Sequence, residues 1–172
     1  MPNAYTERTP EVLTYGHAAM SEEALEWIYR TAASLARDAE AAAALGSLAR
    51  AEHEHRTALS ATFPELEEAL PSRAGHDDWA VAQFRRAVIP ELDVDDVRAL
   101  LVVAYRVERG GGELYERWAE TAKTDEGRRL AEQLAKAEAV HRKTVATLFA
   151  RTCGGSIDDD PQSAESIEWP HW

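Results

Sequence analysis

Apolar and small residues recur at steps of three and four along four long stretches of the chain, which is the period of a helix that buries one face. These stretches are residues 10–36, 39–64, 94–122 and 125–152. Start signals support the bounds, since Thr124 and the two acidic residues after it resemble the capped first turn of a helix. We therefore predict four long helices.

The second half of the chain repeats the first at an offset of 86 residues, without a gap. The segment AEHEHRTALSATF (51–63) lies over AEAVHRKTVATLF (137–149). Farther upstream, the same register pairs Glu22 with Glu108 and places a tyrosine seven residues after each of them. Each repeat therefore indicates one helical hairpin.

Residues 65–93 separate the two predicted hairpins and indicate a long crossover, within which residues 77–89 carry the pattern of a short helix. Two hairpins joined by one long crossover form a ferritin-like bundle. We therefore predict an all-α, ferritin-like four-helix bundle over residues 1–152. Residues 153–172 form an acidic tail, which we expect to be disordered or to lie against a partner through its tryptophans.

Six ionisable residues fall on the helix stripes where a packed bundle places apolar side chains. The four carboxylates among them would be strongly destabilised by desolvation and mutual repulsion if they had no partners. Two divalent cations remove that difficulty, because four positive charges balance four negative ones. Each Glu-x-x-His pair also places two ligands one turn apart on the same face. The six residues are Glu22, Glu52, His55, Glu108, Glu138 and His141.

The spacing of these residues places them at one level of the bundle. Glu22 and Glu52 lie equally far from the predicted turn at residues 37–38, and the second hairpin repeats this spacing. Residues equally far from a hairpin turn lie side by side, here about 20 Å from the turn. A site rich in carboxylates and poor in nitrogen favours iron, with manganese as the alternative, over structural zinc. We predict two iron ions per chain; the alternative is a degenerate bundle that binds no metal.

Composition narrows the classes of partner. The chain has 31 acidic residues against 19 lysines and arginines and shows no basic stripe, so we expect no nucleic-acid partner. We see no signal peptide and no apolar stretch that approaches 18 residues, so we expect a cytoplasmic protein that does not enter a membrane. A lone bundle would leave Trp79 or Trp118 partly exposed, which favours a homodimer.

Over about residues 10–150, the chain resembles the rubrerythrin branch of the ferritin-like diiron superfamily. The resemblance depends on a glutamate on the core stripe followed by Glu-x-x-His, a set that occurs twice. It implies that Glu52 and Glu138 bridge two irons. It also implies that one further glutamate and one histidine complete the shell of each metal, namely Glu22 with His55 and Glu108 with His141.

Two tyrosines and one glutamate extend the resemblance. Tyr29 and Tyr115 match family positions whose hydroxyls hold the carboxylates in place, although helical spacing also suits ordinary core aromatics. The family usually carries an extra glutamate three residues after its third-helix ligand, where this chain has Gly111. Glu26, one turn from Glu22, is either a substitute for that carboxylate or a solvated helix charge.

Three functions are compatible with the predicted bundle and its six candidate ligands. The first is an oxidoreductase that reduces hydrogen peroxide, or reacts with dioxygen, with a carboxylate or a tyrosine supplying protons. The single cysteine, Cys153, cannot form the iron site of a rubredoxin domain, so the electrons would come from a separate rubredoxin-like or flavin protein. The second is a ferroxidase that handles iron, and the third is a metal-free helical interaction module.

Overall fold

The computed structural model describes residues 10–70 and 92–167, and over these residues the secondary structure is entirely helical. The predicted all-α class is therefore confirmed for this part of the chain. Residues 1–9, 71–91 and 168–172 lie outside the described part. The predicted short helix at 77–89 and most of the predicted crossover fall there.

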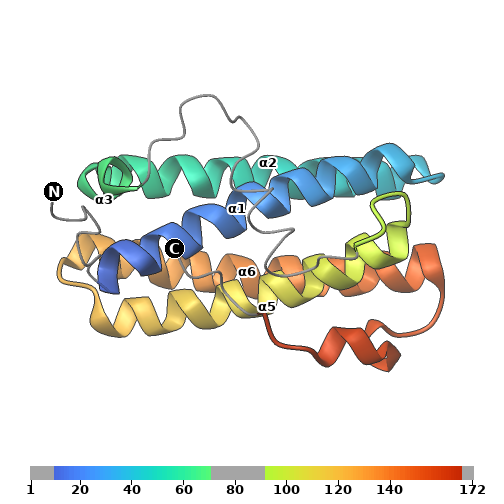
Figure 1. The fold of residues 1–172 in the computed structure, drawn as a ribbon. Coiled ribbons are helices and arrows are strands. Elements are labelled where there is room, and N and C mark those ends of the chain that lie inside the picture. The colour runs from blue at the N-terminus through green and yellow to red at the C-terminus, as the bar shows by residue number, and fades with distance from the viewer. Residues whose placement is uncertain (1–9, 71–91, 168–172) are drawn as a thin grey trace, which may run out of the picture.

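The long helices begin and end close to the predicted bounds, and the largest difference is a start at residue 97 where residue 94 was expected. The second predicted helix is divided near its end by Pro64, which starts a separate short helix. Figure 1 shows the elements in order. They are α1 (Pro10–Leu35), α2 (Ala39–Thr62), α3 (Pro64–Ala69), α5 (Val97–Thr121), α6 (Asp125–Cys153) and two 3₁₀ turns, η1 (Ile157–Asp159) and η2 (Pro161–Ala164).

Polar side chains cap three of the long helices. Asp38 accepts hydrogen bonds from two backbone N–H groups in the first turn of α2, and Asp96 accepts one from the first turn of α5. Thr124 caps α6 in the same way. Such caps satisfy N–H groups that have no partner within the helix. They place the turns where the sequence predicted them, and this fixes the level of each residue along its hairpin.

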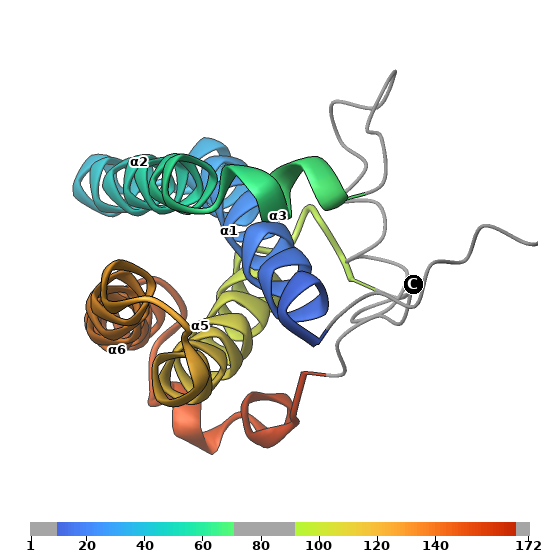
Figure 2. The same cartoon turned by 90° about the vertical axis from the view of Figure 1, so that its left-hand side faces the viewer.

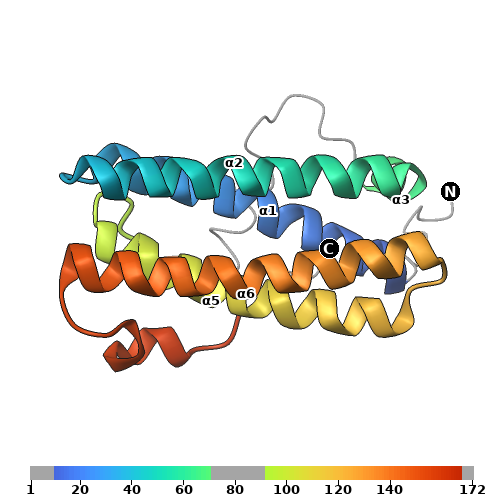
Figure 3. The same ribbon diagram turned by 180° about the vertical axis from the view of Figure 1, so that it is seen from behind.

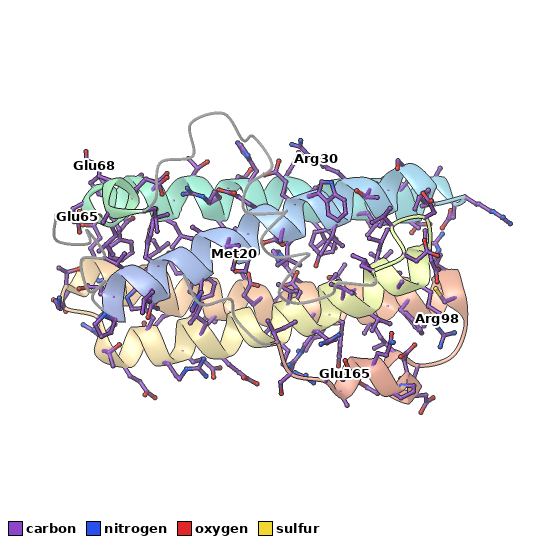
Figure 4. The ribbon with its side chains drawn as sticks, viewed as in Figure 1. Met20, Arg30, Glu65, Glu68, Arg98 and Glu165 are labelled. Atoms are coloured by element: carbon purple, nitrogen blue, oxygen red, sulfur yellow. The ribbon has the colours of Figure 1, made fainter. Side chains whose placement is uncertain are left out.

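The four long helices pack around one axis as two antiparallel hairpins, α1 with α2 and α5 with α6 (Figure 2). Contacts between α1 and α5 and between α2 and α6 close the bundle, and α2 runs antiparallel to α6 (Figure 3). Helix α2 ends at one end of the bundle and α5 begins at the other (Figure 1). Met20, almost fully buried, lies near the middle of the molecule (Figure 4).

Residues 154–167 return along the outer face of α5. Asp160 accepts a hydrogen bond of 2.9 Å from Arg98, and Arg109 donates one of 2.7 Å to the backbone carbonyl of Glu165. Arg98 and Glu165 are labelled in Figure 4. The side chain of Ile157 enters the hydrophobic core and is 1% exposed. The expected disorder is therefore wrong for these residues, which pack against their own chain, whereas Trp169 and Trp172, the expected partner contacts, lie outside the described residues.

Substitution of Ile157 by alanine is expected to lower the free energy of unfolding by about 2–4 kcal/mol, because it removes buried methyl groups and leaves a cavity. Chemical denaturation measures the change. Val140→Ala is the matched control, since Val140 is 60% exposed and its truncation should change stability by less than about 0.5 kcal/mol. Equal, small effects of the two substitutions would contradict the packing of the tail.

Trp118 does not support the predicted homodimer. It is 4% exposed and stacks on Phe63, with ring centroids 4.8 Å apart, inside its own bundle. The expectation that a lone bundle would expose Trp118 is therefore wrong, and Trp79 lies outside the described residues.

Among the described helices, none is both long and apolar enough to cross a membrane.

Candidate metal centre

All six predicted ligands lie near the middle of their helices and face the interior of the bundle. The four glutamates are at most 1% exposed, although each belongs to a residue type that is almost never buried without a partner. The side chains of the two histidines are 15% and 12% exposed. Helices α1 and α5 each contribute one glutamate, and α2 and α6 each contribute a Glu-x-x-His pair. The equal spacing from the turns therefore brings these residues together.

Four of the six residues form a compact group, in which one potential ligand atom from each lies within 4.8 Å of the others. These are Glu52, His55, Glu138 and His141. The carboxylate of Glu52 lies between the two imidazoles, with its Oε1 2.8 Å from His141 Nδ1 and its Oε2 3.2 Å from His55 Nδ1. The two rings are nearly parallel, with centroids 5.3 Å apart. A carboxylate between two imidazoles is suitably placed to contact two cations at once.

Glu22 and Glu108 lie beside this group, each next to one of the two histidines. Glu22 Oε2 lies 3.3 Å from His55 Nδ1, and Glu108 Oε1 lies 3.8 Å from His141 Nδ1. The two residues are pseudo-symmetric, as the internal repeat of the sequence requires. All six predicted residues therefore meet in one place, four in the compact group and two beside it.

The two buried tyrosines are paired crosswise with these flanking glutamates. Tyr29 of α1 donates a hydrogen bond to Glu108 of α5, and Tyr115 of α5 donates one to Glu22 of α1. Tyr115 holds Glu22 Oε1 and leaves Oε2 beside His55, whereas Tyr29 holds Glu108 Oε1 and leaves Oε2 without a hydrogen-bond partner. The spacing of residues along the chain did not indicate which glutamate each tyrosine contacts. The internal repeat could have indicated it. Because the two hairpins are equivalent, a contact from a tyrosine of the first to a glutamate of the second implies the same contact in the other direction.

Five buried side-chain atoms of the cluster lack a hydrogen bond of acceptable geometry, and this is costly in a protein interior. They include both carboxylate oxygens of Glu52 and the Nδ1 atom of His141, although these two residues approach to 2.8 Å. One oxygen of Glu108 and one of Glu138 complete the set. Unpaired carboxylate oxygens together with an imidazole nitrogen are the kind of donors that iron or manganese accepts. The residues therefore fit a metal centre.

The pKa values of the clustered groups also indicate a site that lacks balancing positive charge. Burial raises the pKa of Glu22 to about 7, and the nearby Glu52 adds to the increase while His55 opposes it. Burial and the surrounding carboxylates also raise the pKa values of Glu108 and Glu138. Burial alone would lower the pKa of His55, but hydrogen bonds with Glu138 and other glutamates raise it to about 12. Without metal, the cluster therefore holds extra protons, which balance the negative charge that bound cations would otherwise balance.

Glu26 does not join the cluster. It forms ion pairs with Arg30 of its own helix and with His53 of α2, whose Nδ1 lies 3.3 Å from the Glu26 carboxylate. The side chain of His53 is 65% exposed, so these contacts belong to the outer surface of the α1–α2 hairpin. Glu26 is therefore an ion-paired helix charge whose own side chain is 16% exposed, and it does not replace the missing carboxylate of the cluster.

Comparisons with models of protein families, with curated proteins and with solved structures find no match to this chain. The arrangement of its own residues therefore carries the functional argument.

Proposed function

We propose that this chain is a ferritin-like diiron protein of rubrerythrin type, which reduces hydrogen peroxide with electrons from a separate protein donor. The observation that carries the proposal is the buried cluster, in which two Glu-x-x-His pairs and two flanking glutamates converge with unpaired donor atoms. Four carboxylates neutralise two divalent cations, so the charge of the site favours a metal pair over a single ion.

The residues would have distinct roles in holding the metals. Glu52 would be shared by both ions, because its two oxygens lie beside the two imidazoles. Glu138, its counterpart in the internal repeat and a member of the same compact group, would be shared in the same way. Glu22 with His55, and Glu108 with His141, would each complete the shell of one ion. A bound iron pair would supply two electrons and Lewis acidity, which together suit a two-electron reduction of peroxide to water.

The side chains around the ions would control geometry and protons. The hydroxyls of Tyr29 and Tyr115 hold one oxygen each of Glu108 and Glu22, which restricts the rotation of these carboxylates. Burial and the adjacent glutamates raise the pKa values of both tyrosines, so the hydroxyls keep their protons at neutral pH. Each O–H group already donates to a glutamate of the site, and a protonated donor is what peroxide reduction to water requires.

The test is to express the full chain with iron, purify it without oxygen and measure the metal bound per chain. Optical spectra are then recorded during addition of hydrogen peroxide or of dioxygen. We expect two irons per chain and faster oxidation by peroxide than by dioxygen. Preferential oxidation by dioxygen would instead favour the ferroxidase alternative. A folded protein that binds neither iron nor manganese would refute the metal centre.

A further inference from the structure

Gly111 has no side chain, and a side chain at this position would occupy space beside the candidate metal centre. Gly111 lies in the middle of α5, against Glu138 of α6. A Cβ atom built there would lie 3.1 Å from Glu138 Oε2 and 3.8 Å from its Cδ. The shorter distance is closer than most Cβ contacts in proteins, so Glu138 would have to move to accept even a methyl group.

The carboxylate of Glu138 has little room to move. Its residue is 1% exposed, and its other oxygen, Oε1, lies 3.5 Å from His55 Nδ1. Ligand atoms of Glu52 and of both histidines lie within 4.8 Å on the cluster side. A side chain at position 111 would therefore displace the carboxylate by at least a few tenths of an ångström from the position it has among the other ligands.

Backbone conformation does not explain a glycine at this position. Among the described residues, positive φ angles occur at Gly154 and Gly155 only, so the backbone at Gly111 is one that any residue can adopt. Glycine is also among the least favourable residues in the interior of a helix. The advantage of Gly111 must therefore offset that cost, and the space beside Glu138 supplies the reason.

We propose that Gly111 is a positioning residue for the metal centre, which keeps open the space that the Glu138 carboxylate needs in order to contact the metals. This inference rests on the proposed function, because it assigns Gly111 a role in metal binding by Glu138. A longer side chain at position 111 would compete for the space that Glu138 occupies here.

The neighbouring glycine provides a matched control. A Cβ atom at Gly112 would meet Glu138 Cβ at 3.6 Å, which is an ordinary van der Waals contact. Gly111→Ala and Gly112→Ala add the same methyl group to adjacent positions of the same helix. Both remove a glycine from the helix interior, so any general effect of helix stiffness is common to the two variants. Only Gly111→Ala places the methyl group against the carboxylate.

The experiment titrates the full-length wild type and both variants with Fe²⁺ without oxygen, and with Co²⁺, whose visible spectrum reports the number and geometry of its ligands. We expect Gly111→Ala to weaken binding of at least one ion by about tenfold or more and to change the cobalt spectrum. Gly112→Ala is expected to bind within about twofold of the wild type, with an unchanged spectrum. Thermal unfolding of the metal-free proteins checks that both variants are folded.

The outcomes separate this inference from the proposed function. Wild-type affinity and spectrum in Gly111→Ala would overturn the role of Gly111 and leave the metal centre intact. Equal losses in both variants would also overturn it, because they would show that helix pliability matters and not the space beside Glu138. Absence of metal binding by the wild type would instead overturn the proposed function, and the inference with it.

Discussion

Replacement of Glu52 by glutamine is expected to reduce metal binding from two ions per chain to at most one. Glu52 lies between His55 and His141 and is almost fully buried, so both metals would lose a ligand and the site would lose one negative charge. Residues that only support a metal ligand typically contribute 10–100-fold to affinity, so loss of a shared ligand should cost about 100-fold or more. Metal analysis after dialysis and anaerobic titration with Fe²⁺ measure the change.

The control is Glu54→Gln, which makes the same chemical change on the exposed face of the same helix. It should bind metal as the wild type does. Peroxide-driven oxidation of iron is expected to disappear in Glu52→Gln and to persist in Glu54→Gln. Two tightly bound ions in Glu52→Gln would contradict the placement of Glu52 between the metals.

The sequence was sufficient to predict the helices and the meeting point of the six ligands because both depend on regular spacing. Helical period assigns a residue to a face, and equal distance from a turn assigns it to a level of the bundle. Glu22 and Glu52 could therefore be placed together without a structure. The repeat then placed the second hairpin's ligands in the same way, and only the packing of one hairpin on the other had to be assumed.

The features that could not be predicted depend on contacts between side chains distant in sequence. Ile157 lies in a short segment rich in glycine and aspartate, where no periodicity reveals that it enters the core. Trp118 is buried because Phe63 stacks on it and Tyr15 packs edge-on against it, and no pattern within α5 reports those contacts. For Glu26, spacing alone placed the residue one turn from Glu22 but could not show that its carboxylate turns outward to His53.

The metal-free protein is expected to lose stability as the pH rises from about 5 to about 8. Burial raises the pKa of Glu22 from 4.5 to about 7 in the folded state. The folded protein therefore binds this proton more tightly than the unfolded chain, and the resulting stability is lost as the pH rises through the folded-state pKa. This shift alone contributes on the order of 3 kcal/mol. The raised pKa values of Glu108, Glu138 and His141 act in the same direction.

Bound metal should reverse this dependence. Cations compete with protons for the same carboxylates and imidazoles, so their affinity rises with pH. At a free metal concentration of 100 times the dissociation constant, each site adds about 2.7 kcal/mol to stability. Chemical denaturation with and without Mn²⁺, which avoids iron oxidation, measures both trends. The stabilisation by metal should therefore be larger at pH 8 than at pH 5.

The Glu22→Gln variant tests whether the Glu22 carboxylate contributes to both pH dependences, that of the metal-free protein and that of the metal-bound protein. Its neutral amide cannot ionise, so the metal-free variant should lose less stability between pH 5 and pH 8 than the wild type. The same substitution removes a metal ligand, so Mn²⁺ should stabilise the variant less at pH 8. A metal-free wild type whose stability is constant or rises over this range would contradict the raised pKa values. If stability falls with pH in the metal-free protein and rises with pH in the metal-bound protein, the same buried carboxylates destabilise the metal-free bundle and bind the ions.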